Sequence, residues 1–230
     1  MSFTPKNICI IPARSGSKRI PRKNIKEFLG KPIIAYSIEA AIHSQLFDEV
    51  MVSTDDEEIA EVAKHYGAKV PFLRSSKNAD DYATTVDVLI EVLNEYKSIG
   101  KAFDLSCCIY PTAPLVKLEN LKEGHQKIKE SHFDVVFPVV KFSYPIWRAF
   151  KKDKDKFKML WSEHQQSRSQ DLEEAYHDAG QWYWFRPQRL LKHKTLFNDN
   201  TSCVVLKETE VQDIDNETDW KLAELKYELL

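Results

Sequence analysis

Short apolar runs alternate with amphipathic segments along the first 140 residues of the chain. The runs are rich in β-branched residues, and the segments between them repeat their apolar residues at helical spacing. We expect strands at residues 8–12, 49–53, 69–73, 105–110 and 135–140. Strands that alternate with helices are typical of βαβ units. The pattern therefore predicts the α/β class, with a mostly parallel central sheet flanked by helices.

Capping residues mark where several of the helices begin. Asp55 with Glu58 forms a capping box before one helical repeat, and Thr84 with Asp87 repeats this device before the next. Pro32 suits the first turn of a helix that runs to about residue 44, because its missing N–H is not needed there. We expect these three helices to cover the sheet.

The alternation stops at residues 142–176, where charged residues are interspersed with aromatic ones. Aromatic side chains on an insertion need a surface to cover them, and two interpretations stay open. We favour a protruding hairpin that packs on a second subunit, and a mobile lid is the alternative. Strand character returns at residues 181–185 and 202–206, and residues 217–228 are expected to form a last helix. We expect one domain over residues 1–230, with residues 142–176 as its arm.

The basic residues are concentrated in one segment. The 230-residue chain has a net charge of -2, yet residues 14–31 hold seven basic groups and one acidic group. That segment is at +6, which leaves -8 for the remainder. A local basic focus suits a small anionic ligand, whereas nucleic-acid and membrane binders usually carry a net basic face. We therefore expect no nucleic acid and no membrane as partners.

The four cysteines lie inside apolar runs and lack the spacing of a metal site. They predict packed thiols in a reduced compartment, which is the cytoplasm. No apolar stretch reaches the roughly 18 residues that a membrane span needs. A soluble, non-secreted, cytoplasmic protein is therefore expected.

The basic segment begins with ARSGSKRIPRKN, directly after the first predicted strand. Open α/β sheets bind ligands at the carboxyl ends of their strands. This loop has one glycine and matches neither glycine-rich phosphate motif, so phosphate binding would depend on side chains. Arg14 can donate to two phosphate oxygens, Lys18 and Lys23 supply compact charges, and Ser17 adds a short donor. A solvated basic loop is the alternative that charge alone leaves open.

Two aspartates near the end of the chain are candidate metal ligands. Asp213 and Asp215 lie two residues apart on an extended segment, so both carboxylates face one side. Such a pair suits Mg²⁺, which usually takes one or two carboxylates together with substrate phosphates. Asn216, Glu217 and Asp219 also make a good cap for the last helix, and the two interpretations are compatible.

The basic loop resembles a known signature. Ala-Arg14, Ser17-Lys18 and Lys23-Asn24 reproduce the A-R-x-x-S-K-x-x-x-x-K-N pattern of the cytidylyltransferases that activate sialic-acid-like nine-carbon sugars. The segments VSTDDEEIAEVAKHYGA and LRSSKNADDYATT resemble further blocks of that family. The resemblance implies a Rossmann-like nucleotidyltransferase fold with an inserted dimerisation arm, and a loop that wraps the phosphates of CTP.

The same resemblance implies roles for individual residues. Arg14, Lys18 and Lys23 would be catalytic, and the D-x-D pair of Asp213 and Asp215 would hold the metal. The nucleotide-binding residues would be Arg14, Ser17, Lys18, Lys23, Asn24, Arg74, Ala83 and Thr85. Without the family, Arg74 would be interpreted as an ordinary surface ion pair.

The expected sugar-binding half departs from the sialate enzymes. YPTAPL, at residues 110–115, stands where they carry Q-P-T-S-P-L-R, and residues 167–185 replace their R-x-Q-x-L-P and N-G-x-x-Y blocks. Together with HDAGQ and an aromatic run, these residues resemble the pseudaminic-acid branch of the family. The implied sugar-binding residues are Tyr110, Arg168, Gln170, His177, Asp178 and Gly180.

The implied reaction is attack of the anomeric hydroxyl of a nine-carbon ulosonic acid on the α-phosphate of CTP. It gives a CMP-sugar, for bacterial surface glycans or flagellin, and pyrophosphate, with charge stabilised by the loop and Mg²⁺. Pseudaminic acid is the preferred sugar, and N-acetylneuraminate and legionaminate are alternatives. The family also implies a homodimer.

Two questions stay open at this point. The general base is a water held by Asp213 or Asp215, the metal acting on the hydroxyl itself, or His177. From another reaction class, a GT-A-like glycosyltransferase that uses a nucleotide sugar would share the architecture and the D-x-D pair.

Overall fold

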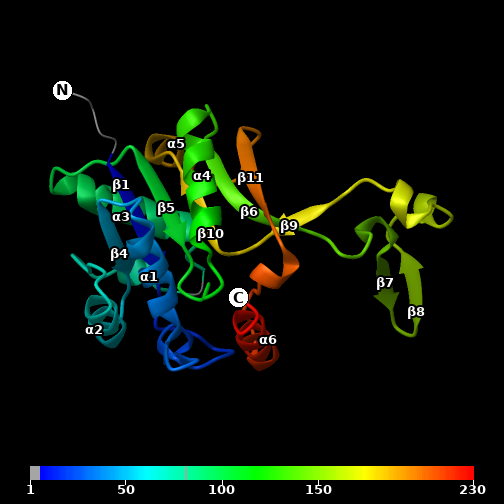
Figure 1. Cartoon of the computed structure of the whole chain (residues 1–230), viewed down its shortest axis with the longest axis horizontal. Coiled ribbons are helices and arrows are strands. Elements are labelled where there is room, and N and C mark those ends of the chain that lie inside the picture. The colour runs from blue at the N-terminus through cyan, green and yellow to red at the C-terminus, as the bar shows by residue number, and fades with distance from the viewer. Residues whose placement is uncertain (1–5, 81) are drawn as a thin grey trace.

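A seven-stranded mixed sheet forms the centre of the molecule (Figure 1). This computed structural model describes residues 6–80 and 82–230. The strands follow the order β11-β6-β10-β5-β1-β4, and β9 also pairs with β6. Their bounds are β1 Asn7–Pro12, β4 Glu49–Ser53, β5 Leu105–Ile109, β6 Val135–Lys141, β9 Tyr176–Asp178, β10 Trp182–Phe185 and β11 Thr201–Leu206.

The sheet is mostly parallel, as the sequence predicts. Strand β1 pairs in parallel with β4 and β5, and β11 pairs in parallel with β6. Strand β10 runs antiparallel between β5 and β6. Strands β9 and β10 both run antiparallel to β6. Residues 179–181 separate them, and Gly180 in this break has a φ of 61°. A left-handed conformation costs a glycine little, so Gly180 suits this kink.

The strand predicted at residues 69–73 is wrong. This segment makes a single parallel bridge, between Lys69 and Met51, and forms no further ladder. Lys69 turns both its N–H and its carbonyl oxygen toward β4, so residue 71 would do the same in a longer strand. Pro71 has no N–H to donate there. The sheet therefore ends at β4 on this side.

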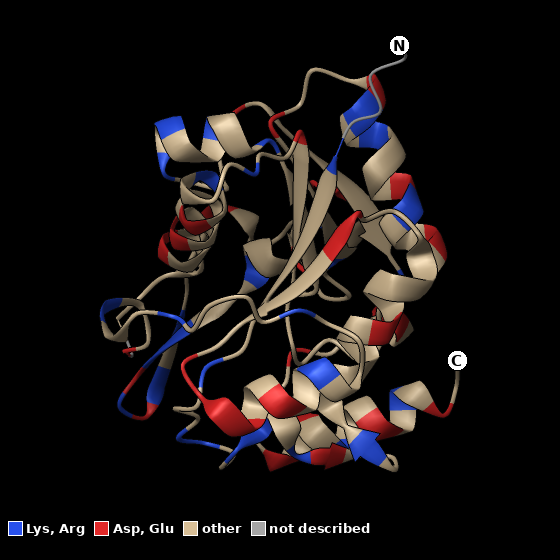
Figure 2. Cartoon of the chain, turned by 90° about the vertical axis from the view of Figure 1, so that its left-hand side faces the viewer, with Lys and Arg blue, Asp and Glu red and all other residues tan. Residues whose placement is uncertain are grey.

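Helices cover both faces of the sheet. Their bounds are α1 Ile33–Ser44, α2 Glu57–His65, α3 Thr85–Ser98, α4 Leu118–Glu130, α5 Pro187–His193 and α6 Glu217–Tyr227. Helices α1, α2 and α4 share one buried cluster with the strands, and α3 and α5 share another. Helices α4 and α5 have no counterpart among the elements predicted above. Figure 2 shows charged residues on the outer helices and loops, whereas the central strands are nearly free of them.

The predicted caps are largely confirmed. Thr84 and Asp87 form the capping box of α3, and Asn216 caps α6. The cap of α2 is shifted by one residue: Asp56, not Asp55, accepts from the N–H of Ile59 at 2.9 Å. Asp55 instead binds the basic loop, as described below. Pro32 is likewise the N-cap of α1 and not its first residue.

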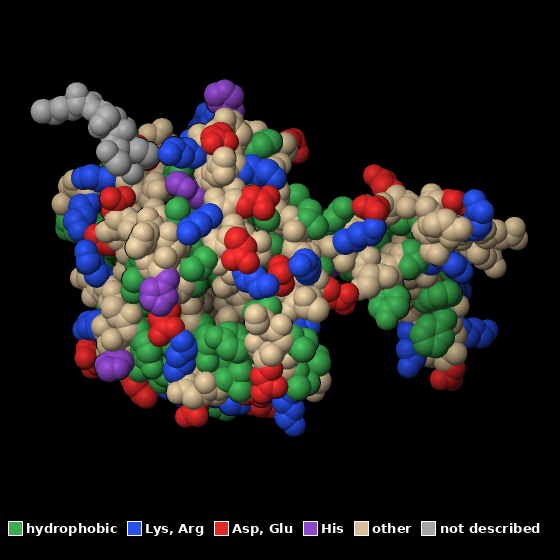
Figure 3. All heavy atoms as spheres, viewed as in Figure 1, with side chains coloured by type: hydrophobic (Ala, Val, Ile, Leu, Met, Phe, Trp, Pro, Cys, Tyr) green, Lys and Arg blue, Asp and Glu red, His purple; other side chains and the backbone are tan. Residues whose placement is uncertain are grey.

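The segment between β6 and β9 projects from the body of the molecule (Figure 1). It carries an antiparallel hairpin of β7 (Phe150–Asp153) and β8 (Lys156–Met159), separated by two residues. Hydrophobic side chains are exposed on this projection (Figure 3), among them Phe150 and Phe157. The protruding hairpin is therefore present, and its packing on a second subunit stays a prediction.

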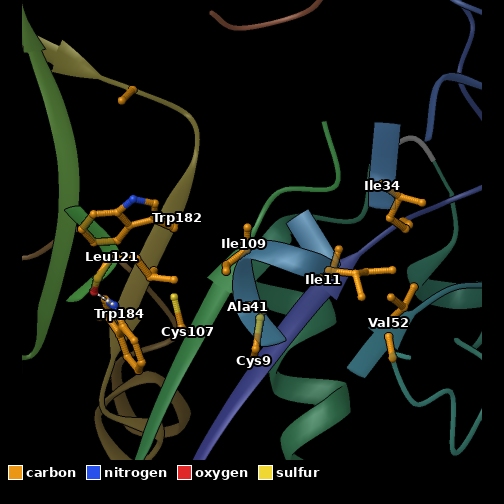
Figure 4. Close-up of a cluster of buried hydrophobic side chains, with 14 of the residues drawn as sticks. Cys9, Ile11, Ile34, Ala41, Val52, Cys107, Ile109, Leu121, Trp182 and Trp184 are labelled. Carbon is orange, nitrogen blue, oxygen red and sulfur yellow. Dashed lines mark hydrogen bonds between the residues drawn. The ribbon is translucent and has the colours of Figure 1, made fainter. Parts of the chain in front are cut away.

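The main core lies where β1, β5 and β10 meet the helices (Figure 4). Cys9 and Ile11 of β1 belong to the cluster with α1, whereas Ile8 and Ile10 belong to the cluster with α3. Burial on both faces explains why this strand is a continuous apolar run. Burial also raises the pKa of the Cys9 thiol.

The cysteine prediction agrees with the structure. Cys9, Cys107 and Cys108 are buried free thiols, and Cys203 is half-buried and also free. In the described residues, no helix is both long and apolar enough to cross a membrane.

A third cluster lies beneath the basic loop. It joins Ile20 and Phe28 of the N-terminal region to Ile33 and Tyr36 of α1 and, from the end of the chain, to Ile214, Trp220 and Ala223. The short ladder of β2 (Glu27–Phe28) with β3 (Lys31–Pro32) closes the loop above it. This cluster brings the two ends of the sequence together at one edge of the sheet.

Helix α4 approaches β10 closely at Gly124. A Cβ atom there would lie 2.5 Å from Cζ3 of Trp182, a ring that is fully buried. In an open helix, Gly→Ala is stabilising by about 1 kcal/mol. Here we expect Gly124→Ala to lower the free energy of unfolding by about 1–3 kcal/mol, because overpacking displaces the ring.

Chemical denaturation followed by tryptophan fluorescence measures this change. Lys122→Ala, at an exposed position of the same helix, is the control and should change stability by less than about 0.5 kcal/mol. A Gly124→Ala variant as stable as the wild type would contradict this account of the α4 packing.

Candidate functional site

A cleft of about 530 Å³ opens at the carboxyl ends of β1 and β5. Pro12, the last residue of β1, and Tyr110, which follows β5, both line it. Open α/β sheets bind ligands at this edge. Ten of the residues predicted for the site line the cleft: Arg14, Ser17, Lys18, Lys23, Asn24, Arg74, Ala83, Thr85, Tyr110 and Asp215.

The basic charge of the loop is divided between two tasks. Arg14, Lys18, Arg19 and Lys23 line the cleft. The other three basic residues lie outside it and pair with carboxylates: Arg22 with Asp56 and Glu58, Lys26 with Glu217, and Lys31 with Glu39. The net charge of +6 counted along the sequence is therefore not all at the cleft, where four of the seven basic residues lie.

Hydrogen bonds within the protein hold the loop in shape. The buried Asn24 donates from Nδ2 to the carbonyl oxygen of Arg14 at 2.8 Å. Asp55 accepts from the N–H of Ser15 at 3.1 Å and from its hydroxyl at 2.6 Å. Arg14 donates to the carbonyl oxygen of Asp80 at 2.9 Å. Asn24 thus closes the loop, and Asp55 fastens it to the end of β4.

Arg74 is buried at the cleft wall and is not a surface ion pair. Only 8% of it is exposed, and it donates from Nε to the hydroxyl of Ser53 at 3.1 Å and from Nη2 to the Ser53 carbonyl oxygen. Within the described ranges, no carboxylate lies at ion-pair distance from it. Burial lowers the pKa of Arg74, although nearby carboxylates such as Asp55 oppose this effect. A buried cation with neutral partners attracts an anionic or strongly polar ligand.

Lys23 connects the loop to the two aspartates. Its Nζ donates to the carbonyl oxygen of Ile214 at 2.7 Å. Partial burial lowers the pKa of Lys23, and the charges of Asp215 and Asp213 act in the opposite direction. The side chain of Ile214 is fully buried in the third cluster. The residue between the two aspartates is therefore fixed on both its backbone and its side chain.

The donor set at the two aspartates fits a divalent cation. Asp215 lines the cleft, and Asp213 lies beside it outside the lining. The pKa of Asp213 is raised, first by loss of hydration and then by the charge of Asp215. In the part of the chain that the structure describes, no three metal-binding side chains gather around one point. Two carboxylates completed by phosphate and water would suit Mg²⁺ better than a metal that needs a full protein cage.

Tyr110 lines the cleft, and Tyr183 packs against it from behind. The Tyr110 hydroxyl lies 3.1 Å from Oγ1 of Thr85, and its ring centroid lies 5.4 Å from that of Tyr183. Tyr183 donates its hydroxyl to Asp178 at 2.5 Å, and Asp178 also accepts from the N–H of Gly180 at 2.8 Å. Asp178 and Gly180 therefore hold Tyr183 in place behind Tyr110. Burial raises the pKa of Tyr110.

Five of the six residues predicted for the sugar do not line this cleft. Asp178 and Gly180 lie behind Tyr110, as described above. His177 is exposed on β9, with its ring against Phe142. Arg168 pairs with Asp171 on the projecting segment, and Gln170 lines a second hollow at the base of that segment. Their roles stay predictions, and within one chain they are not part of the main cleft.

Two residues of this region, Arg19 and Tyr183, are not among those predicted for the site. Arg19 was counted in the charge of the loop, yet it lines the cleft and pairs with Asp215 at 2.7 Å. Tyr183 was part of an aromatic strand, and its contact with Asp178 gives it a second role. The position of Arg19 between Lys18 and Lys23 is a sequence signal for its place at the cleft. Nothing in the local sequence indicates the contact of Tyr183 with Asp178.

The arrangement can bind a polyphosphate chain. A cleft at the carboxyl ends of β1 and β5 is lined by four cations of the loop, by the buried Arg74 and by one of the two aspartates, Asp215. Such preorganised charges stabilise the negative charge that develops on phosphate oxygens and on a leaving pyrophosphate.

Known proteins resemble this chain over nearly its whole length. A family model described as cytidylyltransferase matches residues 8–219. The pseudaminic acid cytidylyltransferase of Campylobacter jejuni serotype O:2 is 45% identical over 225 residues, which cover 97% of each chain. The CMP-N,N'-diacetyllegionaminic acid synthase of Legionella pneumophila is 33% identical and covers 96% of each.

The fold also matches a solved structure. A CMP:2-keto-3-deoxy-manno-octonic acid synthetase, complexed with CTP, superimposes with a TM-score of 0.72 and 19% identity, over 98% of this chain and 100% of that one. This likeness concerns the fold, and it confirms the predicted Rossmann-like nucleotidyltransferase architecture. On the family match and the close relatives together, the chain belongs to the cytidylyltransferase family, and it is a nucleotidyltransferase.

Proposed function

We propose that this chain transfers CMP from CTP to pseudaminic acid. The anomeric hydroxyl oxygen of the sugar attacks the α-phosphorus, and the bond to the β-phosphate breaks. Pyrophosphate leaves, and the proton of the hydroxyl passes to a base. The observation that carries the proposal is the full-length similarity to pseudaminic acid cytidylyltransferase, together with a cleft lined by four cations of the loop and by Asp215.

The phosphates of CTP would lie along the basic loop. Arg14 offers two parallel donors, and Lys18 and Lys23 are point charges that suit an oxygen whose charge grows as the bond breaks. Arg74 would use its buried charge on the nucleotide, with Ser17, Asn24, Ala83 and Thr85 completing that side. Binding of an anion there would offset the cost of burying a guanidinium.

We propose Mg²⁺ as the cofactor, held by Asp213 and Asp215. When bound, it would neutralise phosphate charge and favour departure of pyrophosphate. The role of this chain is to hold the two carboxylates at the cleft, through the buried Ile214 and the bond from Lys23. The proton would pass to one of the three candidate bases named above, of which His177 lies outside the main cleft.

The sugar would occupy the end of the cleft at Tyr110. The Asp178–Tyr183 contact fixes the wall behind it, and Gly180 allows the backbone to turn there. A tyrosine where sialate enzymes carry glutamine changes the hydrogen-bonding groups offered to the sugar. This difference supports pseudaminic acid over N-acetylneuraminate.

We further propose a homodimer in which the projecting segment covers a second copy. On the hairpin, Phe150 pairs with Met159 and Lys152 with Phe157 on one face, whereas Lys151 and Lys158 share the other. A two-stranded hairpin with an exposed apolar face is marginal alone, so it favours a partner surface. Arg168 and Gln170 would then reach the sugar of the second copy. As a biosynthetic enzyme it would act in the cytoplasm.

Replacing Lys23 tests the phosphate loop. We expect Lys23→Ala to cost about 2 to 4 kcal/mol of transition-state stabilisation, because it removes a preorganised charge donor. This loss lowers kcat/KM. Steady-state pyrophosphate release measures this change. Lys26→Ala removes the same charge from the same loop outside the cleft, and it should keep kcat/KM within a few-fold. Equal losses in both variants would contradict the division of the loop.

A product assay tests the sugar and the reaction class. With CTP and Mg²⁺, pseudaminic acid should release pyrophosphate faster than N-acetylneuraminate or legionaminate. A higher rate with either of those acids would overturn the choice of sugar. A glycosyltransferase would instead release a nucleotide only when an acceptor is present, without pyrophosphate.

Charge placed on the apolar face of the hairpin tests the dimer. We expect Phe150→Glu with Phe157→Glu to yield a monomer in light-scattering chromatography, since two carboxylates would be buried in the interface. Lys151→Glu with Lys158→Glu changes the opposite face and should leave the dimer intact. A dimer that survives the first pair of substitutions would contradict this assignment.

A further inference from the structure

Arg19 holds the carboxylate that the metal would need. Its Nη2 donates to Oδ1 of Asp215 at 2.7 Å, and both residues line the cleft. The two side chains are 67% and 43% exposed, so the pair can open into solvent. An exposed pair of this kind contributes at most about 1 kcal/mol, and it exchanges readily for a stronger partner.

The other cation of this corner does not take that place. Lys23 donates to the carbonyl oxygen of Ile214, and among the described residues Arg19 is the basic group at ion-pair distance from Asp215. The backbone N–H of Asp215 donates to Asp219 at 2.9 Å, which fixes the main chain beside it. The carboxylate therefore stays at the cleft while its counter-ion can change.

Arg22 offers a contrast within the same loop. It binds Asp56, the N-cap of α2, at 2.7 Å, and also Glu58, and neither carboxylate lines the cleft. Its pairing fastens the loop to a helix. Among the residues that the structure describes, Arg19 pairs with Asp215, and that carboxylate is one of the two proposed for Mg²⁺. Its pairing is therefore placed to compete with the metal.

We propose that Arg19 is a placeholder cation, which neutralises Asp215 until a metal-bound nucleoside triphosphate enters and then moves to the phosphates. The inference rests on the proposed function, since it takes Asp215 as a metal ligand and CTP as the ligand of the cleft. Arg19 is thus a positioning residue for Asp215 before binding and a phosphate ligand afterwards.

The exchange follows from charge and geometry. An Asp215 oxygen that accepts from a guanidinium at 2.7 Å is poorly placed to bind a metal as well. When a divalent cation arrives with a triphosphate, it neutralises the carboxylate more strongly, and the freed guanidinium finds phosphate oxygens in the same cleft. The free protein would therefore bind the metal weakly, and the nucleotide would raise the metal affinity.

Metal binding without turnover tests this exchange. Mn²⁺ binding to the full chain is titrated by electron paramagnetic resonance, first with protein alone and then with CTP. We expect Arg19→Gln to bind Mn²⁺ about three- to fivefold more tightly than the wild type without nucleotide, the upper range for releasing an exposed ion pair. The gain in Mn²⁺ affinity on adding CTP should shrink by a similar factor.

Two further variants make the outcome specific. Arg22→Gln removes the same charge outside the cleft, and its Mn²⁺ affinity should stay within twofold of the wild type. Adding Asp215→Asn to Arg19→Gln should abolish the gain. The proposal is overturned if Arg19→Gln binds Mn²⁺ no more tightly than Arg22→Gln, or if the gain survives without Asp215. Failure of the reaction itself would appear separately, as absent pyrophosphate release by the wild-type protein.

Discussion

The bond from Lys23 to the carbonyl oxygen of Ile214, 2.7 Å long, joins parts of the chain that are 191 residues apart. The arrangement of the cleft depends on it. The buried side chain of Ile214 packs with Ile20 and Phe28, so an apolar cluster fixes the same corner from below. Without this cluster the two aspartates would lie on a surface segment, far from the phosphate loop. The segment that carries the two aspartates is thus held by hydrophobic burial and one charge-assisted hydrogen bond.

The second constraint is the way in which the loop uses its charges. A glycine-rich phosphate loop offers backbone amides, whereas this loop has one glycine. Its shape is held by a hydrogen bond that Asn24 donates to Arg14 and by those that Ser15 donates to Asp55. Those bonds hold the backbone of a loop from which Arg14, Lys18, Arg19 and Lys23 line the cleft. Three further cations are neutralised outside by nearby carboxylates. The cleft therefore concentrates positive charge in a chain whose net charge is slightly negative.

The opposite end of the cleft is organised by the sheet itself. The antiparallel course of β9 and β10 breaks at Gly180, next to the end of β5. The break turns Asp178 toward the hydroxyl of Tyr183, whose ring lies against Tyr110. The residues of the projecting segment stay away from this wall within one chain. In the proposed dimer, a second copy would supply them to the sugar site.

The sequence by itself determined the α/β class, most strands, the caps of α3 and α6, and the location of the basic loop. These features follow from local periodicity and from side chains that satisfy nearby backbone groups. The resemblance in the loop identifies the family from the sequence alone. The strand expected at residues 69–73 failed because pattern alone does not weigh the N–H that Pro71 lacks.

Only the tertiary structure decided which charges serve the ligand. Arg19 and Arg22 are chemically identical and three residues apart, yet one faces Asp215 in the cleft and the other fastens the loop to α2. The same holds for Arg74, whose burial without a carboxylate no local pattern reveals. Long-range packing sets the partner of each charge, and the free energy of an ion depends on that partner and on its hydration more than on its place in the sequence.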